Sequence, residues 1–376
     1  MSKIGINLLF IKPKLSGGSE TYALKLLKEI SQLDKDNEYI LYINKDCENI
    51  KFHVGENFTK RVLNFKPSSV YLRYFWEQFV LPFYVFIDKI DLLHSLGYVT
   101  PLLTTSKKVV SILDINYKGH GNNMGSSKRI LLGTMVNLSA FFSNKIITIS
   151  EFSKQQITKY TKTRANKISV TLLSGSSDVI QINTIEKELI LKKYNINTEY
   201  IIAFGSPSPH KNIVRLVESV EGIIKNRPDL KLVLVGHQQR DEDLLNCIQK
   251  LQLADEILFT GFVPDEDIQP LLTCAKVFVF PSLYEGFGIP LLDAQACGVP
   301  VISSNAGSLP EVGGSDVFYF NPEDVIEISE VISRALELSD TGEISDNVKN
   351  GLTNREKFSW AKTAEQTLKV YSELLN

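Results

Sequence analysis

Short runs of consecutive apolar residues alternate along the chain with longer segments in which apolar residues recur every three or four positions. The longer segments, such as 21–33 and the segment that starts at Glu151 behind a capping Ser150, predict amphipathic helices. Strands that are apolar at every position are typical of a parallel sheet covered by helices on both faces. In the first half of the chain, strands are expected at 4–10, 39–43, 108–113, 145–149 and 166–172.

The same alternation begins again near Tyr200, after a small and polar segment at 174–187. Helices are expected to begin near residues 212, 241, 265 and 290, between strands at 201–204, 231–235, 256–259, 277–280 and 300–303. The predicted fold class is α/β, with two Rossmann-like parallel-sheet domains that face each other across a cleft. The expected boundaries are 1–178 and 179–358, followed by a terminal helical segment at 359–376.

Composition agrees with a soluble globular protein, since 43% of the 376 residues are hydrophobic and 22% are charged. No apolar run reaches the roughly 18 residues that a membrane-spanning helix needs, and the first residues do not resemble a signal peptide. A cytoplasmic location is therefore expected. The four cysteines have no metal-ligand spacing, which favours reduced, packed thiols.

The net charge of −2 conceals an uneven distribution. Residues 1–180 carry 24 Lys and Arg against 14 Asp and Glu, whereas residues 181–376 carry 17 against 29. Two interpretations remain open. The basic half rests on an anionic membrane surface or attracts a diphosphate-bearing acceptor, or else the two halves simply attract each other. The sequence contains no nucleic-acid-binding signature, so no nucleic-acid partner is expected.

Aromatic residues crowd around Arg73 in the segment YLRYFWEQFVLPFYVF at 71–86. This density is sufficient for a patch at a membrane interface. The alternative is a helix whose rings pack inside the first domain. Part of this face is expected to meet a lipid-linked acceptor.

The clearest chemical signal is the segment PSLYEGFGIPLLD at 281–293, directly after the predicted strand 277–280. Glu285 follows the strand, and Gly286 and Gly288 remove the Cβ atoms that would keep a ligand away from the backbone. Pro290 suits the first turn of a helix, whose free N–H groups and dipole favour a phosphate. Asp293 is placed to accept a hydrogen bond from a hydroxyl. A carboxylate, a phosphate site and a hydroxyl acceptor together indicate a nucleotide diphosphate sugar.

Several motifs in order resemble the family 4 retaining glycosyltransferases of the GT-B fold, and the resemblance covers nearly the whole chain. It implies a metal-independent hexosyltransferase, a terminal helix that crosses back to the first domain, and peripheral contact with the inner membrane. The implied donor is a GDP or UDP sugar and the acceptor is a growing lipid-linked oligosaccharide. Mannose is favoured because SLYEGFGIP and SLPEV resemble the mannosyltransferases of O-antigen and capsule assembly. The motifs are GGSETYALKLLKEI, DLLHSLGYVTP, ITISEFSKQQI, FGSPSPHKN, FTGFV, the run from PSLYEGFGIP to SLPEV, and FSWAKTAEQTLKVY.

The resemblance also assigns roles to residues. Lys211 is expected to contact the donor pyrophosphate and stabilise the leaving diphosphate, and Glu285 is expected to touch the transferred sugar. Asp114 is the candidate for binding the acceptor hydroxyl or accepting its proton. These three residues form the expected catalytic set. The further donor-binding candidates are Gly17, Gly18, Ser206, His210, Gly236, His237, Phe262, Gly286, Phe287, Gly288, Ile289 and Asp293, and the further acceptor-binding candidates are Glu20 and His120.

The sequence departs from the family pattern at several of these positions. Leu113 stands where members commonly have a histidine that contacts the sugar, which leaves His120 as a substitute. Ser206 and His210 stand where one arginine is usual, and Asp293 stands where a glutamate is usual. Front-face attack and a covalent intermediate both remain open.

Three D-x-D patterns raise the question of a metal ion, which such a motif holds in the GT-A fold. They lie at 34–36, 241–243 and 265–267, in a polar turn or at helix starts, where carboxylates satisfy the helix dipole. No metal or other cofactor is therefore expected. Two alternatives to a transferase remain open, a nucleotide-sugar 2-epimerase of the same architecture and a non-catalytic nucleotide-sugar-binding scaffold. A nicotinamide oxidoreductase is disfavoured because no G-x-G-x-x-G follows the first strand.

Overall fold

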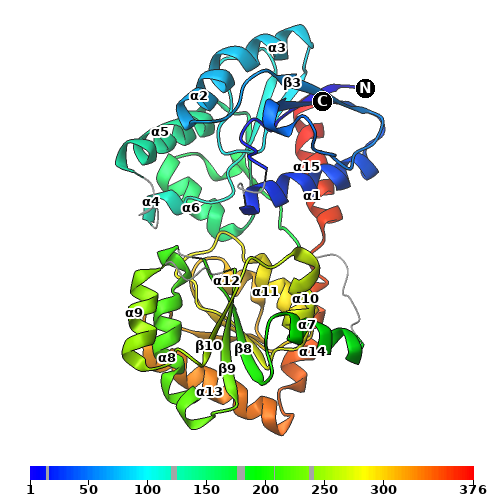
Figure 1. Ribbon diagram of the computed structural model, residues 1–376. Coiled ribbons are helices and arrows are strands. Elements are labelled where there is room, and N and C mark those ends of the chain that lie inside the picture. Colours follow the sequence, from blue (N-terminus) through cyan, green and yellow to red (C-terminus); the bar gives the residue numbers. More distant parts are fainter. Residues whose placement is uncertain (14–16, 120–124, 176–182, 207, 237–240) are drawn as a thin grey trace. The chain divides into compact units, whose positions relative to one another are not determined.

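The computed structural model describes residues 1–376 with the exception of 14–16, 120–124, 176–182, 207 and 237–240. The chain divides into two units, each built on its own parallel sheet (Figure 1). Unit 1 comprises Met1–Leu173 and Ser359–Asn376, and unit 2 comprises Ser174–Phe358. The two Rossmann-like α/β domains predicted from the apolar periodicity are confirmed.

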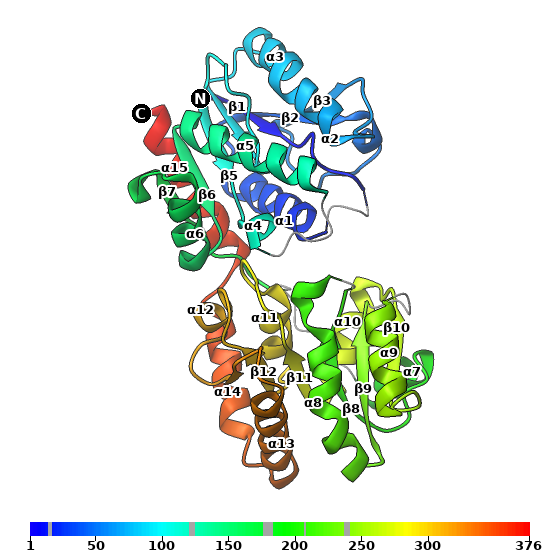
Figure 2. The same cartoon turned by 90° about the vertical axis from the view of Figure 1, so that its left-hand side faces the viewer.

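Unit 1 contains a seven-stranded parallel sheet in the order β3-β2-β1-β4-β5-β6-β7. Its central strands are fully buried because helices cover both faces, as Figure 2 shows for α1 and α5. The strands are β1 (Lys3–Asn7), β2 (Glu38–Asn44), β3 (Phe58–Leu63), β4 (Leu92–Ser95), β5 (Lys107–Ser111), β6 (Lys145–Thr148) and β7 (Ile168–Val170). The helices are α1 (Gly17–Leu33), α2 (Val70–Phe75), α3 (Leu81–Ile87), α4 (Asn116–Gly119), α5 (Ser126–Phe142), α6 (Glu151–Thr161) and α15 (Trp360–Leu375), with short turns η1 (Lys45–Cys47), η2 (Trp76–Val80) and η3 (Ala165–Lys167).

Unit 2 contains a six-stranded parallel sheet in the order β10-β9-β8-β11-β12-β13. Apolar side chains of α8, α9 and α13 pack on one face, and those of α7, α10, α11 and α12 pack on the other. The strands are β8 (Glu199–Phe204), β9 (Leu230–Val235), β10 (Ile257–Gly261), β11 (Val277–Phe280), β12 (Val301–Ser304) and β13 (Phe318–Phe320). The helices are α7 (Thr184–Lys193), α8 (Ile213–Asn226), α9 (Glu242–Leu251), α10 (Asp265–Thr273), α11 (Ile289–Ala296), α12 (Leu309–Gly313), α13 (Val325–Thr341) and α14 (Ser345–Arg355), with the short turn η4 (Pro209–Lys211).

Several expected boundaries need correction. The first strand ends at Asn7 rather than at residue 10, because the chain turns there and the Leu9 N–H donates to the Asn7 side chain, 3.1 Å away. The first helix begins at Gly17 rather than at residue 21, with Gly17 itself in the left-handed region at φ 54°. Ser150 caps α6 as expected by accepting from the Ser153 N–H at 3.0 Å.

A buried polar cluster attaches the C-terminal helix α15 to unit 1. His94 on β4 lies between Tyr371 of α15, 2.6 Å from Nδ1, and Ser111 of β5, 2.8 Å from Nε2. The Ser111 hydroxyl is also 2.9 Å from that of Tyr22 on α1. Burial lowers the pKa of His94 to about 3, so the ring is neutral. The His94 imidazole thus joins α15 to the strands β4 and β5, and Ser111 extends the cluster to α1.

The aromatic segment forms α2 and α3 with the π-helical turn η2 between them. Pro82 has no N–H to donate, and the Leu81 N–H reaches the Trp76 carbonyl one residue further away than in an α-helix. Trp76 stacks on Phe65 with ring centroids 4.7 Å apart. The π turn therefore adds a residue to the helix at this point and changes which side chains face the sheet.

Candidate functional site

An ion pair in unit 2 joins two of the residues expected from the sequence. Lys211, at the end of η4, donates from Nζ to Oε1 of Glu285 at 2.7 Å. The Nζ atom also lies 5.3 Å from the ring centroid of Phe280, the last residue of β11. Both side chains are only partly exposed, at 22% and 16%. A cation and a carboxylate therefore adjoin at the carboxyl end of the sheet, where ligands of open α/β sheets bind.

The glycine loop leads from Glu285 into α11. Gly288 has φ 105°, and a Cβ there would lie 2.6 Å from the Leu309 side chain, so the position requires glycine. Pro290 follows in the first turn, as expected, but α11 begins one residue earlier, at Ile289. The Phe287 ring is buried against Phe358, with centroids 5.9 Å apart. The Phe287 ring therefore packs in the interior, and only the backbone of this residue faces the loop.

A second loop, missed by the sequence reasoning, supports Glu285. Gly307 has φ 66°, and a Cβ there would lie 2.7 Å from the Glu285 carbonyl oxygen and 2.9 Å from its nitrogen. The Ser308 hydroxyl donates to the carbonyl oxygens of Glu285 at 3.0 Å and Phe287 at 2.9 Å. The backbone of Glu285 is thus fixed by the AGSL segment. The glycine inside SSNAGSLPEV was the available signal, although its long-range contact is not readable from spacing.

Asp293 lies on α11, eight residues after Glu285. Its Oδ1 faces the backbone of Gly175, where an added Cβ would come within 2.6 Å. The carboxylate is partly exposed. A hydroxyl-binding role for it stays a prediction.

The other donor-binding candidates surround the carboxyl ends of β8, β9 and β10. Ser206 lines a cavity of about 350 Å³, in which the charged side chains are those of Arg215, Glu218, Asp241 and Asp243. The His210 carbonyl accepts from the Leu283 N–H at 2.7 Å, which joins the Lys211 turn to the glycine loop. Gly236 has φ 78°, and Phe262 is 82% exposed. His237 lies outside the described residues.

In unit 1, Asp114 follows β5 and its Oδ1 accepts from the Asn116 N–H at 3.1 Å. The residue lines a cavity of about 360 Å³, together with Ser19 and Arg73. Leu113 is buried at 4% exposure and contributes to the core rather than to this cavity. Glu20 lies in the first turn of α1 behind the exposed glycines. Among the described residues, no atom lies within 4 Å of a Cβ added at Gly17 or Gly18. His120 lies outside the described residues.

One carboxylate of each D-x-D pattern has structural partners. Asp34 accepts from the backbone N–H groups of residues 36 and 37 and from the Tyr39 hydroxyl. Asp241 caps α9 by accepting from the Leu244 N–H at 3.2 Å, and Asp267 accepts from the Tyr194 hydroxyl at 2.6 Å. Within the described ranges, no group of three His, Cys, Asp or Glu side chains is arranged to hold a metal ion.

An apolar face covers the outer side of α2, η2, α3 and α5 in unit 1. Phe75, Phe79 and Phe83 are 53%, 71% and 60% exposed. Beside them is a groove of about 650 Å³, lined almost entirely by apolar and aromatic side chains. The aromatic segment thus contributes only some of its rings to the core. In the part of the chain that the structure describes, no helix is both long and apolar enough to cross a membrane.

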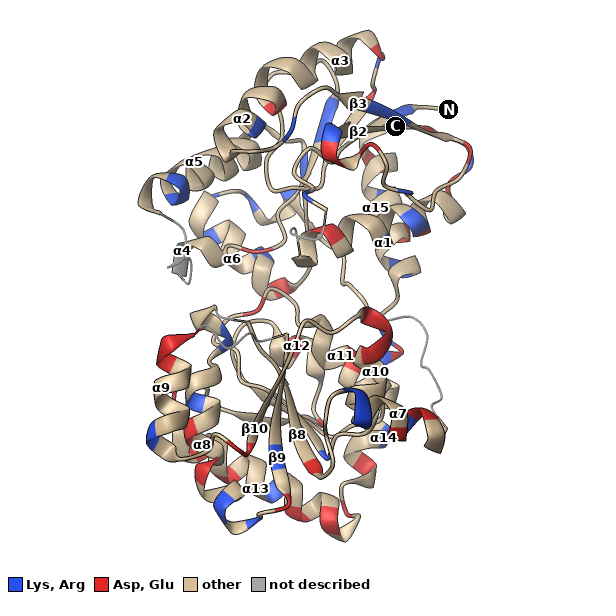
Figure 3. Ribbon diagram, viewed as in Figure 1, with Lys and Arg blue, Asp and Glu red and all other residues tan. Residues whose placement is uncertain are grey.

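The charge difference between the halves is also a difference between the units. Unit 1 contains 26 Lys and Arg against 15 Asp and Glu, and unit 2 contains 15 against 28. Figure 3 shows acidic residues at α9, α10 and α13 of unit 2. Unit 1, which has the excess of Lys and Arg, is therefore also the unit with the exposed apolar face.

Comparisons with known proteins agree with this architecture. Residues 186–351, within unit 2, match the family described as glycosyl transferases group 1. The chain is 36% identical over 232 residues to the O-antigen chain mannosyltransferase B of Escherichia coli, which covers 61% of this chain and 60% of that protein. It is 31% identical over 254 residues to the serotype-specific mannosyltransferase WbdA of Escherichia coli, which covers 64% of this chain but 31% of that protein.

Solved structures share the fold over the whole chain. The crystal structure of Anabaena Alr3699/HepE in complex with UDP and glucose has a TM-score of 0.76 at 19% identity, covering 99% of this chain and 100% of that one. A glycosyltransferase from Rickettsia africae has a TM-score of 0.75 at 18% identity, covering 100% and 99%. Residues 186–351 therefore match the group 1 glycosyl transferases, and the chain has the GT-B fold of two parallel-sheet α/β domains.

Proposed function

We propose that the protein is a retaining hexosyltransferase that moves a sugar, with mannose favoured, from a nucleotide diphosphate donor to a hydroxyl of a lipid-linked glycan. The observation that carries this proposal is the Lys211–Glu285 pair at the start of α11. Because Lys211 and Glu285 are adjacent, a diphosphate bound at Lys211 would lie next to a sugar bound at Glu285. In a nucleotide diphosphate sugar these two groups are joined to each other. The match of residues 186–351 to the group 1 glycosyl transferases and the two mannosyltransferase relatives support the same reaction.

The chemistry follows from the charges at the site. The bond between the anomeric carbon and the β-phosphate oxygen breaks, and the acceptor oxygen bonds to that carbon. Lys211 and the N-terminus of α11 stabilise the negative charge that develops on the departing diphosphate. Glu285 stabilises the positive charge on the sugar ring. Asp114 accepts the proton of the acceptor hydroxyl.

The donor is proposed to bind without a metal ion. Lys211 and the N-terminus of α11 supply the positive charge that a divalent cation supplies elsewhere. GDP-mannose is the favoured donor because of the mannosyltransferase relatives, while UDP is the nucleotide in the Anabaena structure. The nucleotide base is proposed to lie against the exposed ring of Phe262.

The acceptor is proposed to carry a hydrocarbon chain that lies in the apolar groove beside α2 and α5. This groove adjoins the Asp114 cavity, since Tyr74 lines both. Lys108 and Arg73 add positive charge nearby, with the Lys108 Nζ 5.8 Å from the Phe142 ring. An anionic lipid with a glycan head group has a hydrocarbon chain that matches the apolar groove. It also has a negative charge that matches Lys108 and Arg73. The protein is therefore proposed to work at the cytoplasmic surface of a membrane.

The test is transfer from GDP-mannose, UDP-glucose or UDP-N-acetylglucosamine to octyl glycosides, with and without EDTA. The proposal predicts one productive donor, a product with the anomeric configuration of the donor by NMR, and no effect of EDTA. Conversion of the donor to an isomer without an acceptor would identify an epimerase instead. Nucleotide binding with neither transfer nor isomerisation would identify a scaffold.

A further inference from the structure

The cavity that contains Asp114 is built largely from side chains for which the sequence suggested no role. Aromatic rings form much of its wall, and an arginine, a lysine and an aspartate supply charged ends. Its volume of about 360 Å³ is at the lower end of ligand sites. The aromatic residues come from segments far apart in the sequence, namely Phe10, Tyr74, Tyr98 and Tyr117.

Arg73 is the cavity residue with the most unusual surroundings. Its guanidinium carbon lies 4.7 Å from the centroid of the Tyr74 ring, and its side chain is 17% exposed. The Nε atom is buried, and no hydrogen-bond partner for it exists among the described residues. Because Arg73 lines the cavity, its guanidinium can donate hydrogen bonds to the oxygen atoms of a ligand there.

Glu77 lies behind Arg73, one helical turn further along the chain. Its side chain is 1% exposed, and its Oε2 is 3.7 Å from the Arg73 Nε, which is an ion pair without a hydrogen bond. Neither carboxylate oxygen has a hydrogen bond of ordinary geometry in the described part of the chain, although the Asn7 side chain is close enough to lower the pKa of Glu77. Burial raises the pKa of Glu77 to about 7, and Arg73 partly offsets the shift. A buried carboxylate without well-formed hydrogen bonds is costly to the fold, so its retention calls for an explanation.

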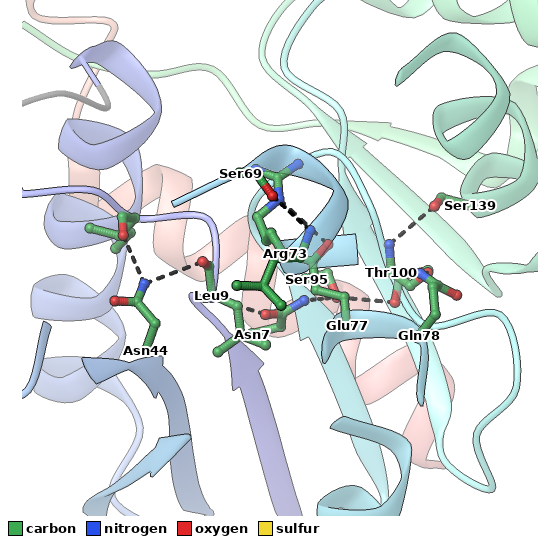
Figure 4. Close-up of polar contacts among 12 residues, drawn as sticks. Asn7, Leu9, Asn44, Ser69, Arg73, Glu77, Gln78, Ser95, Thr100 and Ser139 are labelled. Carbon is green, nitrogen blue, oxygen red and sulfur yellow. Dashed lines mark hydrogen bonds and ion pairs between the residues drawn. The ribbon is translucent and has the colours of Figure 1, made fainter. Parts of the chain in front are cut away.

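The π turn explains how both residues reach this place. η2 inserts an extra residue ahead of Pro82, so Glu77 points into the unit while Gln78 turns towards the 100–102 loop. Figure 4 shows Arg73 and Glu77 together above the polar chain that runs from Asn7 to Ser95. π turns are frequent at functional sites because they reorient a side chain without ending the helix.

We propose that this cavity binds one sugar ring of the acceptor, that Arg73 contacts its oxygen atoms, and that Glu77 is a positioning residue that holds the Arg73 guanidinium. Sugar rings offer C–H faces to aromatic walls and hydroxyls to charged side chains, and the cavity offers both kinds of partner. Asp114 in the same wall accepts a hydroxyl proton while Arg73 donates. The proposal rests on the proposed transferase function and assigns its acceptor site to named residues.

The test compares two arginines of unit 1. Arg73→Met keeps most of the aliphatic stem and removes the charge. Arg61→Met is the matched control, because Arg61 also has a carboxylate partner, Asp88, and lies over a ring, Tyr84, but does not line the cavity.

Acceptor KM is measured with octyl α-mannoside, octyl β-glucoside and octyl N-acetyl-β-glucosaminide. Arg73→Met is expected to raise acceptor KM tenfold to a hundredfold with nucleotide binding unchanged, since a hydrogen bond to a charged group is lost. Arg61→Met is expected to leave both values unchanged.

Two further variants separate contact from support. Arg73→Lys keeps the charge but loses the planar fork, so it should recover part of the acceptor affinity. Glu77→Gln should raise acceptor KM severalfold while the donor KM stays constant. A Glu77→Gln variant that changes only the melting temperature would show that Glu77 is structural and would overturn its positioning role.

Failure of the inference can be distinguished from failure of the proposed function. Unchanged acceptor KM in Arg73→Met, with active wild type, overturns the inference alone. Wild type without transfer overturns the proposed function, and saturation-transfer NMR with the same octyl glycosides then decides the inference. Binding to wild type that is lost in Arg73→Met supports it, and equal binding or no binding overturns it.

Discussion

The site in unit 2 and the cavity in unit 1 are built in different ways. In unit 2, consecutive residues of one loop and one helix start supply most of the groups, and glycines at 288 and 307 allow close backbone approach. In unit 1, side chains from distant segments converge on a cavity whose walls are aromatic and whose arginine is held by a buried carboxylate. Backbone-built sites suit a phosphate that is common to all donors, whereas side-chain-built cavities can differ between acceptors.

The largest effect is expected at Glu285 in unit 2, which the proposed mechanism places beside the reacting sugar. Glu285→Gln removes the charge that stabilises the reacting sugar and should lower kcat by about 10²- to 10³-fold, or roughly 3–4 kcal/mol. Nucleotide binding should remain. Glu221, which pairs with Lys225 on the surface of α8, provides the matched control Glu221→Gln. Equal loss of activity in both variants would contradict the assignment.

The backbone-built character of unit 2 can be tested at two glycines with similar dihedral angles. Gly307→Ala combines a left-handed conformation with overlap against the Glu285 backbone and should cost about 2–4 kcal/mol of stability and most activity. Gly342→Ala has a similar φ of 78° but open space, so it should cost only about 1–2 kcal/mol. Denaturant unfolding measures both. Equal destabilisation would show that the approach to Glu285 is not tight.

Local sequence was sufficient for the glycine loop of unit 2 because its residues lie in one short stretch. The strand β11, the glycine loop and the proline in the first turn of α11 follow from residue types at fixed spacing. The expectation that Lys211 and Glu285 act on the same donor came from the family resemblance. The contribution of Gly307 depends on a contact between two loops, which residue spacing does not encode.

Unit 1 was harder to predict for physical reasons. The strand β3 lies at the sheet edge and is mostly exposed or partly exposed, and β4 is only four residues long, so neither gives a clear apolar run. The π turn before Pro82 changes the direction in which the Glu77 side chain points. Regular helical periodicity therefore predicts the wrong face of the helix for Glu77. A cavity assembled from residues 10, 73, 98, 114 and 117 cannot be recognised without the fold.

Two exposed phenylalanines give opposite expectations for the two units. Phe79→Ser in unit 1 should weaken binding to vesicles that contain anionic phospholipid by about tenfold, because burial of the ring gains roughly 1.5–3 kcal/mol. Phe262→Ser in unit 2 should leave vesicle binding unchanged and weaken nucleotide binding by a similar factor. Cosedimentation and calorimetry provide the two readouts. Loss of vesicle binding in both variants would remove the distinction between the units.

The smallest effect concerns pH and the His94 cluster of unit 1. The pKa of His94 is about 3 in the folded protein and about 6.5 when unfolded, so the unfolded state binds more protons as pH falls below 6.5. Stability from this group is therefore present above pH 6.5 and is lost progressively towards pH 3. Lowering the pH from 7 to 6 should cost about 0.7 kcal/mol. His94→Gln should flatten this part of the pH profile, and replacement of the exposed His53 should not. A profile that His94→Gln leaves unchanged would contradict the assignment of a neutral buried ring.

The most direct measurement is calorimetric titration of GDP and UDP into wild type, Lys211→Ala and Lys225→Ala. The two lysines each pair with a glutamate of unit 2, at 2.7 Å and 2.8 Å, but only Lys211 adjoins the glycine loop. The account predicts that one nucleotide diphosphate binds wild type and Lys225→Ala equally and binds Lys211→Ala at least tenfold more weakly. Equal binding to Lys211→Ala, or no binding of either nucleotide to wild type, would contradict a donor site at Lys211 and Glu285.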